Sequence, residues 1–463
     1  MVQYLFMALI MVAMAAYLIG RAKAFSIAAG NVSALHSRPV YHGTYLAILS
    51  AFPAFLAMVI WPAITNRYLD NAVLSRFGDH LSQLTLPETE AFLRDAKAIA
   101  YGGVIGFRDE TKEAAAEVYL SLQSTADLIL LCIVALLVLV GFLFAIGRIK
   151  VDMRARFFVE KFVLALLLAS SVVAILATIG IVLSLLVETV RFFGKVSFFD
   201  FLFGIHWSPQ SAFEAAGGND ITQDNSRVFG AIPLFTGTLL ITLIAILVAA
   251  PVGLMSAIYL SDYASSSFRS FAKPMLEILA GIPTVVYGFF AALTVAPAIR
   301  GWGENLGLDV SSESALAAGL VMGIMIIPFV SSLSDDVINA VPQSLRDGSA
   351  ALGATKSETI RKVVLPAALP GIVSALLLAI SRAIGETMIV VMAAGLAANL
   401  TANPFEAVTT VTVQIVTLLV GDQEFDSAKT LAAFALGLVL FCITLGLNYI
   451  ALKVVQKYRE QYD

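Results

Sequence analysis

The chain has 463 residues, of which 59% are hydrophobic and 13% charged, and its formal net charge is −4. Because about a quarter of the residues of a soluble domain are charged, this composition argues against a soluble protein and predicts an all-α, polytopic membrane protein. The small net charge gives no indication of a nucleic-acid partner, and the two cysteines, Cys132 and Cys442, lie in apolar runs where we expect no structural disulfide.

Apolar runs long enough to cross a bilayer recur along the whole chain. A transmembrane helix needs about 20 consecutive apolar residues. The sequence therefore predicts about nine transmembrane helices, at 2–19, 44–64, 126–147, 161–187, 232–260, 276–298, 314–333, 370–397 and 429–452.

The first run begins "MVQYLFMALI", without a positive charge, and Arg21 and Lys23 follow it. A secretory signal peptide carries its positive charge before the apolar stretch. We therefore interpret the run as an uncleaved anchor, with cleavage at "AKA" (22–24) as the alternative.

Basic residues are concentrated in every second connection between the predicted spans. They are Arg21, Lys23 and Arg38; Arg148, Lys150, Arg154 and Arg156; Arg269 and Lys273; Arg346, Lys356, Arg361 and Lys362; and Lys453, Lys457 and Arg459. Lysine and arginine favour the cytoplasmic side of a membrane. We therefore predict that these connections are cytoplasmic, with the N-terminus outside and the C-terminus in the cytoplasm.

Two of the predicted outer connections are long. The segment at about 66–126 mixes acidic and basic residues with helical spacing, which indicates a small solvated helical domain or, alternatively, a partner-binding one. The connection at 192–228 contains "FGIHWSPQSAF" and then a Gly/Asn/Asp-rich stretch, which is typical of irregular structure. We expect His206 and Trp207 in it to serve as an interfacial anchor.

The stretch "GSAALGATKS", Gly348–Ser357, resembles a phosphate-binding loop but differs from one in its spacing. In such a loop the Lys directly follows the second glycine and the loop joins a strand to a helix. Here Lys356 comes two residues late, between two predicted spans. We instead predict two short helices, the first capped by Ser344 or Asp347 and broken at Gly353, with Pro366 and Pro370 then stopping and redirecting the chain. The stretch therefore predicts no ATPase in this chain.

The same stretch resembles the EAA loop of ABC importer permeases, in which E-A-A is followed by a glycine and then by I-x-L-P. Asp347, Gly348 and Ser349 take the E-A-A positions, Gly353 is the glycine, and "VVLP" ends the pattern. The resemblance implies a helix pair that docks in a groove of the ATP-hydrolysing subunit. The residues it assigns to this coupling loop are Arg346, Asp347, Gly348, Ser349, Gly353, Ala354, Leu365 and Pro366.

Three further stretches, at 229–263, 276–290 and 381–395, resemble the phosphate permeases, and "SRAIGETMIVVMAAG" is similar to the PstC type in particular. The resemblance covers 158–463 and implies a type I ABC importer permease core of six helices. Residues 1–150 are then an N-terminal extension with three spans and the outer segment. The implied partners are a PstA-type permease, a pair of ATP-binding subunits and an extracytoplasmic phosphate-binding protein, all serving a bacterial inner membrane importer with no cofactor of its own.

Arg382 and Glu386 lie in the otherwise apolar eighth span. An ionisable residue inside the bilayer costs at least about 2.5–3.5 kcal/mol and usually faces a cavity or a partner. Their i,i+4 spacing places both side chains on one helix face, within reach of each other. Either they form an ion pair that only fixes packing, or, with Thr387, they line the path of an anion such as phosphate, which a guanidinium binds well.

Other polar residues are assigned structural roles. We expect Thr236, Thr238 and Thr242 to bond carbonyls of their own helix, Pro283, with Tyr287 and Gly288, to break or kink theirs, and Asp335 and Asp336 to form a cap or a solvated turn. The four scattered histidines predict no metal site, and no catalytic constellation is present.

The sequence therefore predicts the permease subunit of a phosphate importer. A permease for sulfate or molybdate is the alternative within the same class. An ATPase-independent carrier and a membrane sensor are alternatives from other classes; the loop at 346–366 argues against the first, and the second predicts tolerance of substitutions at Arg382.

Overall fold

The computed structural model describes residues 2–28, 32–78, 86–103, 109–209, 228–420 and 427–459. Within these ranges the ordered elements are helices, and one isolated bridge joins Trp207 to Phe229. Nine of the described helices are long and apolar enough to cross a membrane. The prediction of an all-α, polytopic membrane protein is confirmed. The Gly/Asn/Asp-rich stretch predicted to be irregular lies at 210–227, outside the described residues.

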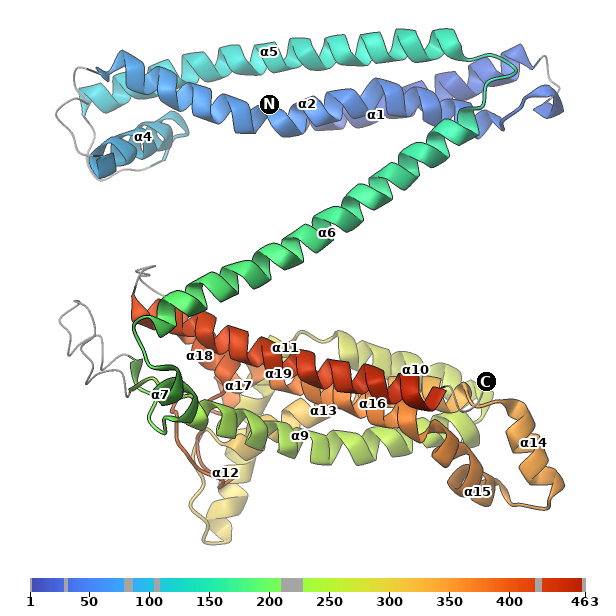
Figure 1. Ribbon diagram of the computed structural model, residues 1–463, viewed down its shortest axis with the longest axis vertical. Coiled ribbons are helices and arrows are strands. Elements are labelled where there is room, and N and C mark those ends of the chain that lie inside the picture. The colour runs from blue at the N-terminus through green and yellow to red at the C-terminus, as the bar shows by residue number, and fades with distance from the viewer. Residues whose placement is uncertain are drawn as a thin grey trace. The chain divides into compact units, whose positions relative to one another are not determined.

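The chain divides into two compact units, Met1–Leu176 and Ala177–Asp463. In the first unit, α1 (Val2–Ile27), α2 (Pro39–Arg76) and α5 (Glu110–Arg148) lie side by side (Figure 1). α6 (Ala155–Phe193) begins in this unit and ends in the second. The contacts between these helices are mostly apolar, with Leu46, Leu130 and Ala54 fully buried, and Lys23 of α1 donates to the carbonyl of Ile146 on α5.

Beyond their apolar stretches, α2 and α5 continue as helices that carry charged and polar residues. These parts pack with α4 (Leu86–Ala100). A small hydrophobic core joins the three helices; its buried members are Leu69, Val73, Phe92, Ala96, Ala115 and Tyr119. Two ion pairs border it, Lys97 Nζ to Asp70 Oδ1 at 2.7 Å and Lys112 Nζ to Asp95 Oδ2 at 2.8 Å. The predicted outer segment is thus built from extensions of two long helices and one short helix.

The second unit is organised around α13 (Ala315–Asn339), which packs against α9 (Ile232–Ile258), α10 (Ser266–Gly281) and α16 (Leu365–Ile384). Gly319 and Gly323 form a G-x-x-x-G pattern on α13 where α9 crosses it. A Cβ at Gly319 would lie 2.7 Å from the Cβ of Ile244 on α9. Small residues at such a crossing let two membrane helices pack closely, so α9 and α13 form one tightly packed pair.

The structure describes eight further α-helices in the second unit. They are α7 (Phe198–Phe203), α11 (Thr284–Phe290), α12 (Ala296–Asn305), α14 (Gln343–Ala351), α15 (Lys356–Thr359), α17 (Met388–Ala393), α18 (Val411–Leu419) and α19 (Ala428–Arg459). In Figure 1, α14 and α15 lie at the end of this unit where α19 ends, and α7, α12 and α18 lie at the opposite end.

Two predicted spans are interrupted rather than continuous. The sixth, expected at 276–298, is divided at Ile282 and Pro283 into α10 and α11, as expected for Pro283. The eighth, expected at 370–397, ends at Ile384 and is followed by the separate short helix α17. The prediction of one helix over 370–397 is therefore wrong, because the chain leaves helical geometry at Gly385.

The prediction that Pro366 and Pro370 stop the chain is also wrong. A single helical run extends over Lys356–Ile384, and a π-helical turn at Ile360–Val364 directly precedes Pro366. Proline removes one backbone donor and crowds the preceding turn. A π turn shifts the hydrogen-bond pattern by one residue, which lets the helix continue through Pro366, and α16 also continues through Pro370.

Trp207 is not a surface anchor. Its side chain is buried in the cluster that includes Phe192, Phe201 and Phe229, and its indole Nε1 donates to Oε1 of Gln414 at 2.9 Å. The neighbouring His206 is exposed. The tryptophan therefore connects the loop before α9 to α18.

Candidate functional site

The predicted coupling loop forms a compact helix–turn–helix. α14 ends at Ala351, and Gly353 then takes φ +83°, a left-handed conformation that favours glycine. Thr355 begins α15 with a capping box, in which its side chain accepts from Glu358 N while the Glu358 carboxylate accepts from Thr355 N. The break predicted at Gly353 is confirmed. The first helix begins after Pro342, not with a Ser344 or Asp347 cap.

Hydrogen bonds within the loop hold most of the other residues assigned to it. The Asp347 carboxylate accepts from Gln343 Nε2 at 3.0 Å, the Ser349 and Thr359 hydroxyls lie 2.9 Å apart, and Ala354 N donates to the Ser349 carbonyl at 3.2 Å. Gly348 has open space around its Cα. Leu365 and Pro366 begin α16. The loop is therefore held closed by its own bonds, while the outer surface of α14 stays exposed.

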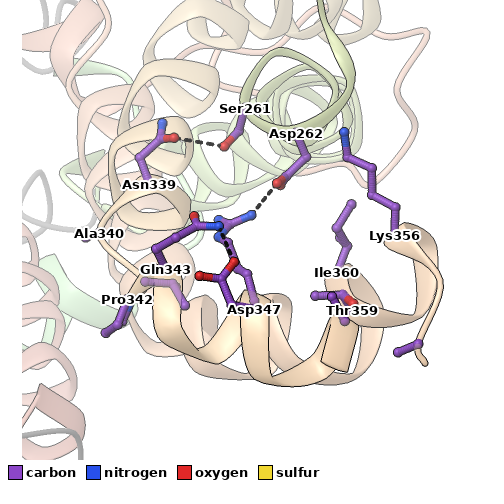
Figure 2. Close-up of a pocket in the computed structure, with 14 residues that line it drawn as sticks. Ser261, Asp262, Asn339, Ala340, Pro342, Gln343, Asp347, Lys356, Thr359 and Ile360 are labelled. Carbon is purple, nitrogen blue, oxygen red and sulfur yellow. Dashed lines mark hydrogen bonds and ion pairs between the residues drawn. The ribbon is translucent and has the colours of Figure 1, made fainter. Parts of the chain in front are cut away.

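A cavity of about 610 Å³ lies between this loop and the ends of α9 and α13. Figure 2 shows Ser261 and Asp262 on one side of it and Gln343 and Asp347 on the other. Two contacts cross the cavity edge: Arg346 forms an ion pair with Asp262, and Ser261 Oγ donates to Asn339 Oδ1 at 3.1 Å. The Arg346 ion pair thus attaches the coupling loop to the end of α9, and the Ser261–Asn339 bond joins the ends of α9 and α13.

A second cavity, of about 220 Å³, lies among α10, α13 and α16 and is unusually polar for a membrane bundle. Its charged lining residues are Lys273, Glu277, Asp335 and Arg382. Ser331, Ser332 and several apolar side chains complete it. Charged groups in a membrane domain usually mark a path or a partner contact, so this cavity is the candidate substrate site.

Arg382 reaches this cavity from the last turn of α16. Its guanidinium lies 5.6 Å from the centre of the Phe329 ring, in cation–π contact. Phe329 is ten residues before the end of α13 at Asn339, about 15 Å along the helix at ~1.5 Å per residue. That is roughly half the thickness of a bilayer core. The Arg382 side chain is exposed on the surface of this chain near the middle of the span.

Asp335 is a functional candidate that the sequence reasoning missed. It is 3% exposed, and its carboxylate accepts from Arg269 Nη2 twice at 3.1 Å, from Lys273 Nζ at 3.0 Å and from Asn339 Nδ2 at 2.9 Å. The hydrogen bond to Asp335 raises the pKa of Lys273. Asp335 thus joins α10 to α13 and is not in a solvated turn. The neighbouring basic residues on α10 were the available sequence signal.

Glu386 does not share a helix face with Arg382, because α16 ends at Ile384. Its Oε1 instead accepts from the backbone N–H groups of Met388 at 3.0 Å and Ile389 at 3.4 Å, at the start of α17. Its own carbonyl accepts from Thr412 Oγ1 at 2.9 Å. The expectation of an i,i+4 pair is therefore wrong. Glu386 stabilises the break beside Arg382, and Thr387 follows it at the N-terminus of α17.

The threonines of α9 differ among themselves. Thr236 and Thr238 donate to the carbonyls of Ile232 and Leu234, as expected. Thr238 also accepts from Val411 N at 3.1 Å and so fixes α18. Thr242 is buried, and its hydroxyl has no partner among the described residues, contrary to expectation. Within the same ranges, no three His, Cys, Asp or Glu side chains are placed to hold a metal ion.

Two family models match the chain. Residues 249–460 match the model described as "Binding-protein-dependent transport system inner membrane component", and residues 6–177 match the model described as "Phosphate ATP-binding cassette transporter". The second match falls in the N-terminal part, for which the sequence resemblance supplied no counterpart.

This chain covers about four-fifths of the length of several curated relatives. A probable ABC transporter permease protein of Bacillus subtilis, YqgH, is 32% identical over 278 residues, 60% of this chain and 84% of that protein. The phosphate transport system permease protein PstC 1 of Mycobacterium tuberculosis is 30% identical over 277 residues, 56% and 81% of the two chains. PstC of Mesorhizobium japonicum is 30% identical over 265 residues, 52% and 79%. A solved structure of the MetNI methionine ABC transporter aligns with 49% of this chain and 95% of its own, at a TM-score of 0.36 and 19% identity.

Proposed function

The chain belongs to the family of binding-protein-dependent transport system inner membrane components, the permeases of ABC transporters, and from this premise we propose that it imports inorganic phosphate as a PstC-type permease subunit. The assignment of phosphate as the substrate rests on relatives that are named as phosphate permeases. This chain covers about four-fifths of their length. The phosphate transporter model on residues 6–177 supports it independently.

We place the protein in a bacterial inner membrane with its N-terminus outside and its C-terminus in the cytoplasm. The basic connections support this orientation, and α14, α15 and the end of α19 lie at one end of the second unit, as one cytoplasmic face requires. Residues 158–463 form the type I permease core in this proposal, and residues 1–150 an extension whose segment at about 66–126 is extracytoplasmic.

The proposed partners are a PstA-type permease, two ATP-binding subunits and an extracytoplasmic phosphate-binding protein. The ATP-binding subunits dock on the loop that carries Arg346, Asp347, Gly348, Ser349, Gly353 and Ala354, which continues into α16 at Leu365 and Pro366. The exposed outer face of α14 supports this role. ATP hydrolysis then takes place on the partner, and this subunit opens and closes the path.

We propose that phosphate passes Arg382, with Glu386 and Thr387 forming the helix break beside it. A guanidinium can donate two parallel hydrogen bonds to phosphate oxygens. The exposed position of Arg382 near mid-span supports a path between this permease and its partner. A broken helix at membrane depth is a common way to present polar groups to a substrate.

The test is uptake of radiolabelled phosphate in cells without this chain and without other phosphate importers, complemented with the wild type, Arg382→Ala or Gly353→Asp at equal membrane levels. We expect the wild type to restore uptake and Arg382→Ala to abolish it. Gly353→Asp should also abolish uptake, because it distorts the turn between α14 and α15, where Gly353 has φ +83°. Arg300→Ala is the matched control, because Arg300 forms an exposed i,i+4 pair with Glu304 on α12.

The rival functions give different results in the same cells. Restored uptake of sulfate or molybdate, but not phosphate, would identify another oxyanion permease. Phosphate uptake that persists without the ATP-binding subunits would identify an independent carrier. A membrane sensor would leave uptake unchanged in every strain, including Arg382→Ala.

A further inference from the structure

We propose that Arg346 transmits movement of α14 to α9 and α13, by linking α14 to Asp262 and to the end of α13 at once. This inference rests on the proposed function, because it requires a motor subunit that docks on the loop. It goes further by naming a contact through which movement of α14 reaches α9 and α13.

The contacts of Arg346 are divided between two helices. Its Nη1 pairs with the carboxylate of Asp262, in the π-helical turn Tyr259–Tyr263 that continues α9. Its Nη2 donates to the carbonyl of Ile338, near the end of α13, at 2.9 Å. The guanidinium is planar and rigid, so a shift of α14 displaces both attachment points together.

The ion pair between Arg346 and Asp262 is largely buried. The Arg346 and Asp262 side chains are only 16% and 8% exposed, so water competes weakly with their pairing. The second oxygen of Asp262, Oδ2, is buried and has no hydrogen-bond partner within the described ranges. Loss of Arg346 would therefore leave a buried carboxylate uncompensated, which is much less favourable than the intact pair.

The alternative routes out of α14 are weaker. In the described part of the chain, the side-chain bonds of Gln343 and Ser349 end within the 343–364 segment, on Asp347 and Thr359. Among the residues that the structure describes, Arg346 is the only one on α14 whose side chain bonds the preceding helices. Because α9 and α13 pack closely at Gly319 and Gly323, a pull on either helix moves the pair.

The link also reaches the candidate substrate site. α13 carries Asp335 and Phe329, which contact Lys273 and Arg382 in the polar cavity. Movement of the end of α13 is therefore felt by the two basic side chains that border the proposed path. Arg346 itself touches no substrate and acts as a positioning residue.

The experiment uses the complete transporter, purified with its partner subunits and reconstituted in liposomes. Arg346→Ala, Asp262→Ala and the double variant are compared with the wild type, with Arg300→Ala as a control ion pair on α12. Four quantities are measured: the amount of ATP-binding subunit that copurifies, basal ATP hydrolysis, hydrolysis stimulated by the binding protein, and uptake of inorganic phosphate.

We expect both single variants to lose stimulated hydrolysis and uptake by about tenfold, a larger loss than that of the copurified ATP-binding subunit or of basal hydrolysis. Because both remove the same link, the double variant should lose about tenfold as well, not a hundredfold. Arg346→Lys keeps the charge but cannot hold both partners, so it should fall between Arg346→Ala and the wild type.

Three results would overturn the proposal: multiplied losses in the double variant, full stimulation in Arg346→Ala, or loss of the ATP-binding subunit from Arg346→Ala, which would show that Arg346 holds the motor directly. Failure of the proposed function looks different. A wild-type complex whose hydrolysis is stimulated, but which moves another oxyanion and not phosphate, would remove the phosphate assignment and leave the link intact.

Discussion

The two compact units of this chain differ in how many of their long apolar helices are interrupted. In the first unit, α2 and α5 run for 38 and 39 residues without a break. In the second unit, described spans are interrupted at Pro283 and Gly385 and contain π-helical turns at Tyr259–Tyr263, Ala291–Val295 and Ile360–Val364. The interrupted helices are thus found in the same unit as the charged cavity, which is the candidate substrate site.

Proline alone does not produce the difference. α2 contains Pro53 and Pro62 and still continues as one helix, and α16 continues through Pro370. At the break after Ile384, by contrast, side chains satisfy the freed backbone groups: the Glu386 carboxylate takes two N–H groups, and Thr412 bonds the Glu386 carbonyl. A helix in the membrane can stop only where such partners exist, so breaks are built by polar residues around them.

The largest effect is expected from Asp335→Ala. The substitution removes the buried acceptor of Arg269, Lys273 and Asn339 and leaves two cations facing each other. Because those cations are about a third exposed, we expect a loss of about 2–3 kcal/mol rather than the full cost of an unpaired buried charge. Uptake should fall by more than tenfold, measured together with the thermal unfolding of the purified complex.

Asp335→Asn is the matched control for that substitution. The amide keeps the size of the side chain and one oxygen acceptor but removes the negative charge. Its effect should therefore lie between Asp335→Ala and the wild type. Equal, wild-type activity in both variants would mean that the polar cavity is only a structural feature of the bundle.

The next largest effect is expected from Glu386→Ala, which removes the acceptor at the start of α17. We expect uptake to fall about tenfold, as for the loss of hydrogen bonds to a charged group. Glu386→Gln retains an oxygen in the same place and should keep most of the activity. Loss of activity in Glu386→Gln, with normal folding by limited proteolysis, would show instead that the negative charge itself acts in transport.

Much of the fold could be predicted from the sequence, because apolar length alone identifies membrane spans. The nine spans, the break at Pro283 and the turn at Gly353 all follow from local chemistry: apolar length, a missing donor and a positive φ. The loop at 346–366 was also recognisable, since its glycine and its L-P pair stand at fixed spacing along the chain.

The site could be predicted only in part. The sequence identifies Arg382, because a charge in an apolar run is conspicuous. It cannot show that the helix ends two residues later, since the partner that stabilises the break, Thr412, is far along the chain. Asp335 was missed for the same reason: its burial depends on Arg269 and Lys273, which lie on another helix.

A smaller effect is expected from Lys273→Ala. The bond to Asp335 raises the pKa of Lys273 above its ordinary value of 10.5. A raised pKa means that the stabilisation is fully present below the ordinary value and is lost only as the pH rises through the higher one. The variant should therefore lower the melting temperature by the same small amount, about 2 °C, at pH 6 and pH 8. A difference between the two would indicate that another titrating group controls the cluster.

The smallest effect is expected from Lys97→Ala, the counterpart of Lys273→Ala in the first unit. Both lysines pair with an aspartate, at 2.7 Å for Asp70 and 3.0 Å for Asp335, and both side chains are about a third exposed, 32% and 37%. The pairs differ in what surrounds the aspartate: Asp335 is shared by three donors beside the polar cavity, whereas the Lys97 pair borders a small apolar core. A partly exposed pair contributes about 0–1 kcal/mol, so Lys97→Ala should leave phosphate uptake within twofold of the wild type while Lys273→Ala lowers it further. Equal losses would mean that the unbroken helices of the first unit take part in transport as directly as the broken ones, and the contrast between the units would then describe helix geometry only.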